Sequence, residues 1–299
     1  MKEGRRSVAF APMLLVCLFL LCAQPLWAQA GGTTTAPAHK HQTKSHTSTA
    51  AAAKPKVKAS ERVIDSSIPE DPAVNAVIAP YSARVRALNV VIGKLSADLI
   101  RSGMGGGAMG NFVVDAIRSR AQVKLGRPVT LAISNYGGLR KKQFSAGDLT
   151  ALDIFQLMPF ENALVTVDLT GEQLLRLLQV IVAERDLQSG AQITYRRTEQ
   201  GSELISAKLG DSPNSLRDID PAAIYQIVTS DYLVKRGGRY AVLGEGRNVT
   251  PLNLTIRDAV SDYVKAETAA GRAIKPTLDN RFVFDRQSST VTTTEGEEP

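Results

Sequence analysis

A strand-like segment runs directly into a helix-like segment between residues 163 and 185, and this junction restricts the chain to folds that mix helices and strands. In ALVTVDL, apolar residues alternate with Thr166 and Asp168, the period of a strand with one buried face. In LTGEQLLRLLQVIVAER, apolar residues recur at helical spacing, and Thr170 with Gln173 matches a capping box. We therefore predict an α+β (mixed α/β) fold, with a half-buried strand followed by an amphipathic helix.

The same two periodicities recur along most of the chain. They predict further helices at residues 68–89, 104–124, 148–157 and 255–270, the second of them behind a glycine-rich loop. They predict strands at residues 90–97, 128–134, 191–197, 203–210 and 223–230. We expect one folded domain at residues 68–286 and a polar tail at residues 287–299.

The first 30 residues have the pattern of a cleaved secretory signal peptide. A basic start is followed by an apolar run and by the small-residue site Ala28-Gln29-Ala30. A membrane anchor is the alternative, but the apolar run is short for a bilayer and contains Pro12. We expect a secreted or periplasmic protein with no membrane span.

Both cysteines of the chain, Cys17 and Cys22, lie inside this leader. A lipid-modified Cys22 is disfavoured because Leu21 precedes it, where a small residue is usual. The mature protein would therefore contain neither disulfides nor thiol chemistry, which suits a bacterial exported protein.

Residues 31–67 are rich in Thr, Ala, Lys and Pro and have the composition of a flexible linker. His39, His41 and His46 lie here, but their spacing matches no usual metal-ligand pattern, so a solvated linker is favoured over a metal site. Much of the net charge of +7 belongs to the leader and this linker. The folded part is close to neutral, and no nucleic-acid-binding face is expected.

The segment AISNYGGLRKKQFSAGDLT, residues 132–150, leads from a strand into Asn135, Gly137, Gly138 and Arg140. Glycines allow a ligand to approach the backbone closely, and the planar guanidinium group suits a phosphate or carboxylate. A tight turn with a solvated arginine is the alternative interpretation of the same residues.

Three segments in order resemble the C-terminal domain of the 5'-nucleotidase family. They are MGNFVVDAIR, the long stretch from SNYGGLRKKQF to LTGEQLLRLL, and TSDYLVKRGG, and the resemblance extends over Ile68–Arg286. It implies that this domain binds a nucleotide or nucleoside between two aromatic rings. The residues that it implies for substrate binding are Asn135, Gly137, Gly138, Arg140, Phe160 and Tyr232.

The chain departs from the family pattern at two positions. Gly105 stands near the place where the family often carries an arginine before Gly110-Asn111. Arg239 stands where the family usually carries an aspartate after Gly237-Gly238. The glycines Gly105, Gly107 and Gly110 also match G-x-G-x-x-G, but the features that accompany a dinucleotide site are absent from the sequence. Either the ligand is more anionic than in relatives, or the site has lost its ability to bind a nucleotide.

The resemblance implies that hydrolysis belongs to a separate metallophosphoesterase domain with two divalent metals. No histidine follows His46, and the residues before the folded domain are too few for such a domain. We therefore expect no catalytic residue, metal or cofactor in this chain, and divalent metals only in a partner metallophosphatase subunit. Three alternatives stand: the substrate-binding half of a split hydrolase for nucleotide catabolism, a stand-alone nucleotide-binding protein, or a non-catalytic interaction module.

Overall fold

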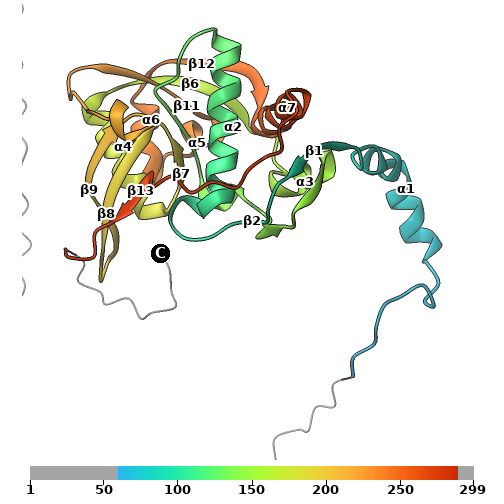
Figure 1. Ribbon diagram of the computed structural model, residues 1–299. Coiled ribbons are helices and arrows are strands. Elements are labelled where there is room, and N and C mark those ends of the chain that lie inside the picture. The colour runs from blue at the N-terminus through green and yellow to red at the C-terminus, as the bar shows by residue number, and fades with distance from the viewer. Residues whose placement is uncertain (1–59, 289–299) are drawn as a thin grey trace, which may run out of the picture. The chain divides into compact units, whose positions relative to one another are not determined.

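The computed structural model describes residues 60–288 of the 299-residue chain (Figure 1). The predicted signal peptide, most of the predicted linker and the end of the predicted tail lie outside the described residues. The helices are α1 (Pro72–Ala87), α2 (Gly107–Leu125), α3 (Ala151–Leu157), α4 (Gly171–Glu184), α5 (Asp231–Arg236), α6 (Ala241–Gly244) and α7 (Ile256–Ala269). The strands are β1 (Val91–Leu95), β2 (Leu99–Ile100), β3 (Leu131–Ser134), β4 (Gln143–Phe144), β5 (Gly147–Thr150), β6 (Ala163–Thr170), β7 (Leu187–Ser189), β8 (Ala191–Thr198), β9 (Gly201–Leu209), β10 (Arg217–Asp218), β11 (Ile224–Ser230), β12 (Arg247–Thr255) and β13 (Phe282–Phe284).

A five-stranded sheet, in the order β12-β6-β11-β3-β7, forms the centre of the domain. Only β11 and β3 run parallel among its pairs, and β6, β7 and β12 are antiparallel to their neighbours. Helices α2 and α7 pack against each other, and α2 also packs on β3 and β7. Helix α4 packs on β6 and on β9. The sheet therefore lies between two apolar cores, which confirms the mixed α/β prediction.

The junction between β6 and α4 forms as the sequence predicts. The side chain of Thr170 accepts a hydrogen bond from the Gln173 N–H, and the Gln173 side chain accepts one from the Thr170 N–H. Leu174, Leu177 and Ile181 are fully buried on one face of α4. Capping and burial together explain why the helix begins directly at the end of the strand.

The prediction of a half-buried strand at residues 163–169 is wrong. Thr166 is buried, and Val165 and Leu164 on alternate faces of β6 belong to different cores. β6 lies between β12 and β11, and helices cover both faces of the sheet. The alternating pattern therefore marks a central strand that tolerates a buried threonine.

Other sequence predictions need smaller corrections. Residues 148–150 belong to β5 rather than to the start of α3. β12 was not expected, because Pro251 and the left-handed Asn248 and Asn253 interrupt its alternation. Proline is tolerated there because β12 is the edge strand of the sheet.

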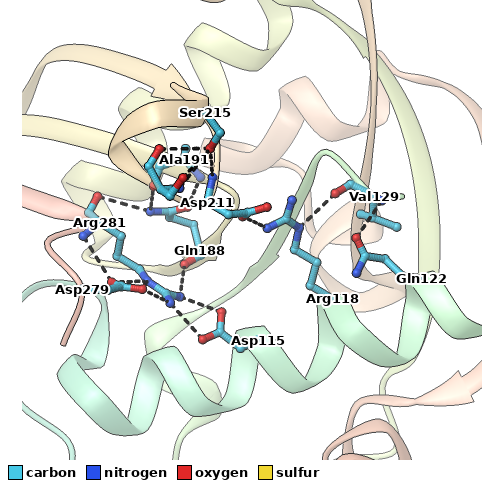
Figure 2. A network of polar contacts seen from close by, with 11 residues as sticks. Asp115, Arg118, Gln122, Val129, Gln188, Ala191, Asp211, Ser215, Asp279 and Arg281 are labelled. Atoms are coloured by element: carbon cyan, nitrogen blue, oxygen red, sulfur yellow. Dashed lines mark hydrogen bonds and ion pairs between the residues drawn. The ribbon is translucent and has the colours of Figure 1, made fainter. Parts of the chain in front are cut away.

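A second sheet, in the order β10-β9-β8-β13, holds the C-terminal segment against the domain (Figure 1). β13 pairs in parallel with β8, and Arg281 just before it forms ion pairs with Asp115 of α2 and with Asp279, both through Nη2. Arg281 also donates a hydrogen bond to the carbonyl oxygen of Gln188 at 3.0 Å (Figure 2). These contacts fasten the end of the described chain to the central helix.

Helix α1 forms as predicted, but none of its residues is buried within residues 60–288. Asp71 caps its N-terminus by accepting hydrogen bonds from the N–H groups of Ala73 and Val74. Val77 and Tyr81 on its apolar face are 69% and 63% exposed. Between residues 60 and 288, none of the helices has the length and apolar character needed to cross a bilayer.

Candidate substrate-binding site

The topology of the central sheet brings the predicted site residues to one edge, namely the edge at which β3 and β11 end and β6 and β7 begin. β3 and β11 are parallel, so Asn135 after β3 and Tyr232 after β11 leave the sheet at the same edge. β6 is antiparallel to β11, with Leu164 opposite Ser230, so the segment that carries Phe160 enters the sheet there. β7 begins at this edge as well, because Leu187 lies opposite Ser134.

The segment after β3 is a single tight turn. Tyr136, Gly137 and Gly138 form a 3-10 helix, and Arg140 donates its backbone N–H to the carbonyl oxygen of Leu157 at 2.9 Å. The side-chain amide of Asn135 makes no hydrogen bond with any described residue, so its donors and acceptor are available.

Neither Gly137 nor Gly138 has the positive φ that would require glycine. A Cβ atom at Gly137 would meet nothing nearer than the Asn135 amide at 3.5 Å, an ordinary contact. A Cβ atom at Gly138 would lie 3.4 Å from the Asn135 amide oxygen. The protein's own packing therefore accommodates a methyl group at both positions.

Arg140 and Phe160 lie together at this edge. The guanidinium carbon of Arg140 is 4.9 Å from the centroid of the Phe160 ring, which is within cation–π range. Phe160 is 38% exposed and Tyr232 is 43% exposed, unusually open for large aromatic side chains. The arrangement offers two accessible rings and a cation.

The backbone segments that carry these two rings are joined by Asp231. Its Oδ1 accepts a hydrogen bond from the N–H of Ala163 at 3.0 Å, and its Oδ2 accepts one from the Nζ of Lys235 at 2.9 Å. Burial alone raises the pKa of Asp231, but these hydrogen bonds and the charge of Lys235 hold the pKa below its usual value. The carboxylate is thus kept ionised as a link between β6 and α5.

A buried carboxylate, Asp186, supports the turn from beneath. Asp186 is 3% exposed and accepts hydrogen bonds from the Tyr136 N–H at 2.8 Å and from the Tyr240 hydroxyl at 2.5 Å. Burial raises the pKa of Asp186, although both hydrogen bonds and the charge of Arg236 oppose this effect. The same surroundings raise the pKa of the Tyr240 hydroxyl, chiefly by burial.

The two departures from the family pattern have structural counterparts. A Cβ atom at Gly105 would lie 2.3 Å from Cε2 of Phe282, so the C-terminal segment fills the space that a side chain there would need. Arg239 forms an ion pair with Glu184 of α4. Neither position offers an unpaired charge to the edge that carries Arg140.

A polar cleft that none of the predicted site residues lines lies beside α2, β8 and the C-terminal segment, with a volume of about 400 Å³. Arg118 and Arg281 line it, and Figure 2 shows both guanidinium groups bound to carboxylates, Asp211 for the first and Asp115 with Asp279 for the second. These arginines are neutralised within the protein, so their ion pairs stabilise the domain and leave little charge for a ligand.

Several residues at the predicted site were not anticipated from the sequence. They are Arg101, Tyr136, Arg185, Asp186 and Asp231, brought there by the sheet edge and by the loops beside it. Tyr136 lies inside the Asn135–Arg140 segment and could have been singled out as an aromatic next to the glycines. The others carry no local pattern, because their roles depend on contacts distant in sequence.

Within residues 60–288, the structure shows no group of three or more His, Cys, Asp or Glu side chains arranged to hold a metal ion. The described residues therefore do not fit the divalent metals of a metallophosphoesterase, and no step through a metal is derived for them.

Comparison with known proteins agrees with this geometry. The family model described as "5'-nucleotidase, C-terminal domain" matches residues 91–245. A 5'-nucleotidase from Vibrio parahaemolyticus is 31% identical over 218 residues, covering 70% of this chain and 37% of that protein. The trifunctional nucleotide phosphoesterase YfkN of Bacillus subtilis is 26% identical over 183 residues, covering 58% of this chain and 12% of that protein.

The fold is also similar to a solved structure, the 5'-nucleotidase precursor from Thermus thermophilus. The TM-score is 0.60 at 22% identity, over 73% of this chain and 44% of the other. The chain thus spans less than half the length of each of these three relatives. By its sequence match and its fold, the chain belongs to the family of the 5'-nucleotidase C-terminal domain.

Proposed function

We propose that this chain is the exported nucleotide-binding half of a 5'-nucleotidase-like hydrolase and acts with a separate metallophosphatase chain. Asn135 and Arg140 contact the ligand, with the guanidinium group of Arg140 near phosphate or ribose. Phe160 and Tyr232 stack on the base from two sides. The divalent metals and the hydrolytic step belong to the partner, and this chain supplies no catalytic residue.

One observation supports the proposal: three backbone segments meet at one sheet edge, and they carry a guanidinium group and two accessible aromatic rings. Asn135 and Arg140 follow β3, Phe160 precedes β6 and Tyr232 follows β11. The hydrogen bond between Ala163 and Asp231 supports a fixed relation between the two ring-bearing segments.

The glycines give independent support. Gly137 and Gly138 could each accept a methyl group without collision in the protein alone, so the fold does not demand glycine there. A ligand held against this turn would explain both residues, because its atoms would occupy the space of the missing side chains.

The expected affinity is modest. Stacking contributes about 1–3 kcal/mol per base, and a charge-assisted hydrogen bond contributes about 1.5–3 kcal/mol. Part of this is offset by the cost of immobilising the ligand. A total near 4 kcal/mol corresponds to a dissociation constant of roughly 1 mM, which suits a site completed by a partner.

Calorimetric titration of the purified protein with AMP and adenosine tests the proposal. Phe160→Ala should abolish measurable binding of both ligands, and Arg140→Ala should weaken AMP more than adenosine. Phe155→Ala is the matched control, because Phe155 is also 38% exposed and has the guanidinium carbon of Arg257 at 5.0 Å from its ring centroid. Equal binding by Phe160→Ala and Phe155→Ala would overturn the site.

The partner is tested by activity. The protein alone should release no phosphate from AMP, and co-purification from the source cells followed by assay with Mn²⁺ should yield a phosphatase that loses activity when Arg140 is replaced. Tight AMP binding by the lone chain without any partner would favour the stand-alone binding protein. A folded protein that binds neither AMP nor adenosine, with or without a partner, would favour the interaction module.

A further inference from the structure

Four arginines surround the turn at residues 135–140, and no ion pair between residues 60–288 involves any of them. They are Arg101, Arg140, Arg185 and Arg236. Arg118 and Arg281, by contrast, are bound to carboxylates. Within the described residues, no carboxylate forms an ion pair with these four arginines, although the charge of Arg236 acts on the buried carboxyl of Asp186.

The four guanidinium groups are positioned by aromatic rings. The guanidinium carbons of Arg101 and Arg185 lie 5.1 Å and 5.9 Å from the centroid of the same ring, that of Tyr136. The guanidinium carbon of Arg236 lies 5.7 Å from the Tyr232 ring and 5.4 Å from the Tyr240 ring. A guanidinium group near a ring face keeps N–H groups for an anion while its rotation is restricted.

Hydrogen bonds connect these rings into one unit. Tyr136 and Tyr240 both donate to Asp186, the first through its backbone N–H and the second through its hydroxyl. Arg101 donates from Nη1 to the carbonyl oxygen of Leu139 at 2.5 Å, directly before Arg140. The four cations thus belong to the same turn and to the residues packed around it.

The acidic residues nearby do not neutralise this charge. Asp231 is engaged by Lys235, and Glu184 by Arg239. Asp186 is buried, and burial raises the pKa of its carboxyl, although the charge of Arg236 opposes this effect. A nucleoside monophosphate carries a charge of about −1.5 to −2 at pH 7, which is too little to balance four guanidinium groups.

We propose that Arg101 and Arg185, on the two sides of Tyr136, form a subsite for a second phosphate, so that the site prefers nucleotides with two linked phosphates over nucleoside monophosphates. Arg140 holds the first phosphate, and Arg236 adds to the positive potential next to Tyr232. This inference rests on the proposed function, because it places the second phosphate relative to a nucleotide bound at Arg140 and Phe160.

Calorimetric titrations with AMP, ADP and ADP-glucose at low ionic strength test the subsite. ADP should bind about tenfold more tightly than AMP, as expected for one further charge-assisted contact. Arg185→Gln should reduce this advantage to within about twofold, because it should weaken ADP binding more than AMP binding. The side chain of Arg185 is exposed and donates no hydrogen bond within the described residues, and glutamine keeps the backbone N–H that caps α4, so its replacement is not expected to disturb the fold.

Arg101→Gln is the second variant; it removes the charge and also the hydrogen bond to the Leu139 carbonyl oxygen, so urea unfolding should first show that the variant is folded. This variant should also remove the advantage of ADP. Arg127→Gln is the matched control: Arg127 is exposed and precedes β3, at the opposite end of that strand. It should bind all three ligands as the unaltered protein does.

The outcomes separate this inference from the proposed function. Equal affinity for AMP and ADP, with both lost in Phe160→Ala, would overturn the second subsite and leave the nucleotide site intact. An ADP preference that survives both Arg101→Gln and Arg185→Gln would overturn the assignment of these arginines. No binding of any nucleotide would overturn the proposed function itself. Two kinds of ligand carry linked phosphates: nucleoside diphosphates, such as ADP, and nucleotide sugars, such as ADP-glucose. A subsite that requires a free terminal phosphate would bind ADP more tightly than ADP-glucose, whereas a subsite open on its far side would bind both.

Discussion

Asp231 accepts a hydrogen bond from the backbone N–H of Ala163, and this bond connects the strand that follows Phe160 to the helix that begins before Tyr232. The two aromatic residues are 72 positions apart in the sequence, yet each lies within three residues of this contact. The two ring-bearing segments are therefore held together by this carboxylate in addition to the pairing of β6 with β11.

Replacing Asp231 should weaken nucleotide binding through the loss of this link. Asp231→Ala removes the hydrogen bond to Ala163 and the ion pair with Lys235, and we expect the dissociation constant for AMP to rise about fivefold, the effect of one hydrogen bond. Asp231→Asn keeps an oxygen for the Ala163 N–H and should retain most of the affinity. Calorimetry checks both, and an equal loss in the two variants would show that the charge rather than the link matters.

Asp186 should make stability depend on pH. In the unfolded chain its carboxyl has the ordinary pKa of 3.8, and burial raises the pKa in the folded protein. The folded state then binds more protons, so the stabilising contribution is complete below pH 3.8 and is lost as the pH rises through the folded pKa. Asp186→Asn cannot titrate, and its free energy of unfolding should lack this decline.

Urea unfolding of both proteins between pH 3 and pH 8 measures the difference. The decline with pH should be present only in the unaltered protein. Parallel curves over the whole range would contradict the assignment of a raised pKa to Asp186.

The ion pairs of Arg281 should be among the strongest stabilising contacts of the domain. Its side chain is 12% exposed, whereas the carboxylates of Asp115 and Asp279 are 40% and 41% exposed and can regain water. We expect Arg281→Gln to lower the free energy of unfolding by about 3 kcal/mol, the low end for a broken buried pair. Arg272→Gln, in a pair whose arginine is solvent-exposed, should lower the free energy of unfolding much less.

Gly105 should tolerate alanine poorly for two separable reasons. Its φ of +66° strains any side chain, and a Cβ atom would collide with Phe282. Gly126 has the same φ of +66° but nothing within 4 Å, so Gly126→Ala isolates the backbone strain of about 1–2 kcal/mol. Gly105→Ala should cost more than Gly126→Ala in urea unfolding, and the excess should vanish when Phe282→Ala is present in both proteins.

The sequence predicts the elements of this fold better than it predicts their contacts. β3, α4 and α7 were recognisable because periodicity and capping residues are local signals. β12 was missed because Pro251 interrupts its pattern, and β13 because three residues are too few to show a period.

The candidate site was found by resemblance rather than by local pattern. Arg140 and Phe160 were named from the family motifs, whereas the meeting of their segments at one edge depends on the register between β6 and β11. Asp186 gave no signal, because an acidic residue at the end of a helix is ordinarily solvated. Its burial depends on Tyr240, which lies 54 residues later.

The contact between Arg281 and Asp115 joins residues 166 positions apart, and it therefore also orders events during synthesis. A nascent chain emerges from its N-terminus, so α2 and the glycine-rich loop leave the ribosome long before the residues that fasten them. Until Arg281 and Phe282 arrive, Asp115 lacks its ion pair and Gly105 its covering ring. The native state can therefore be completed only after Arg281 and Phe282 have been translated.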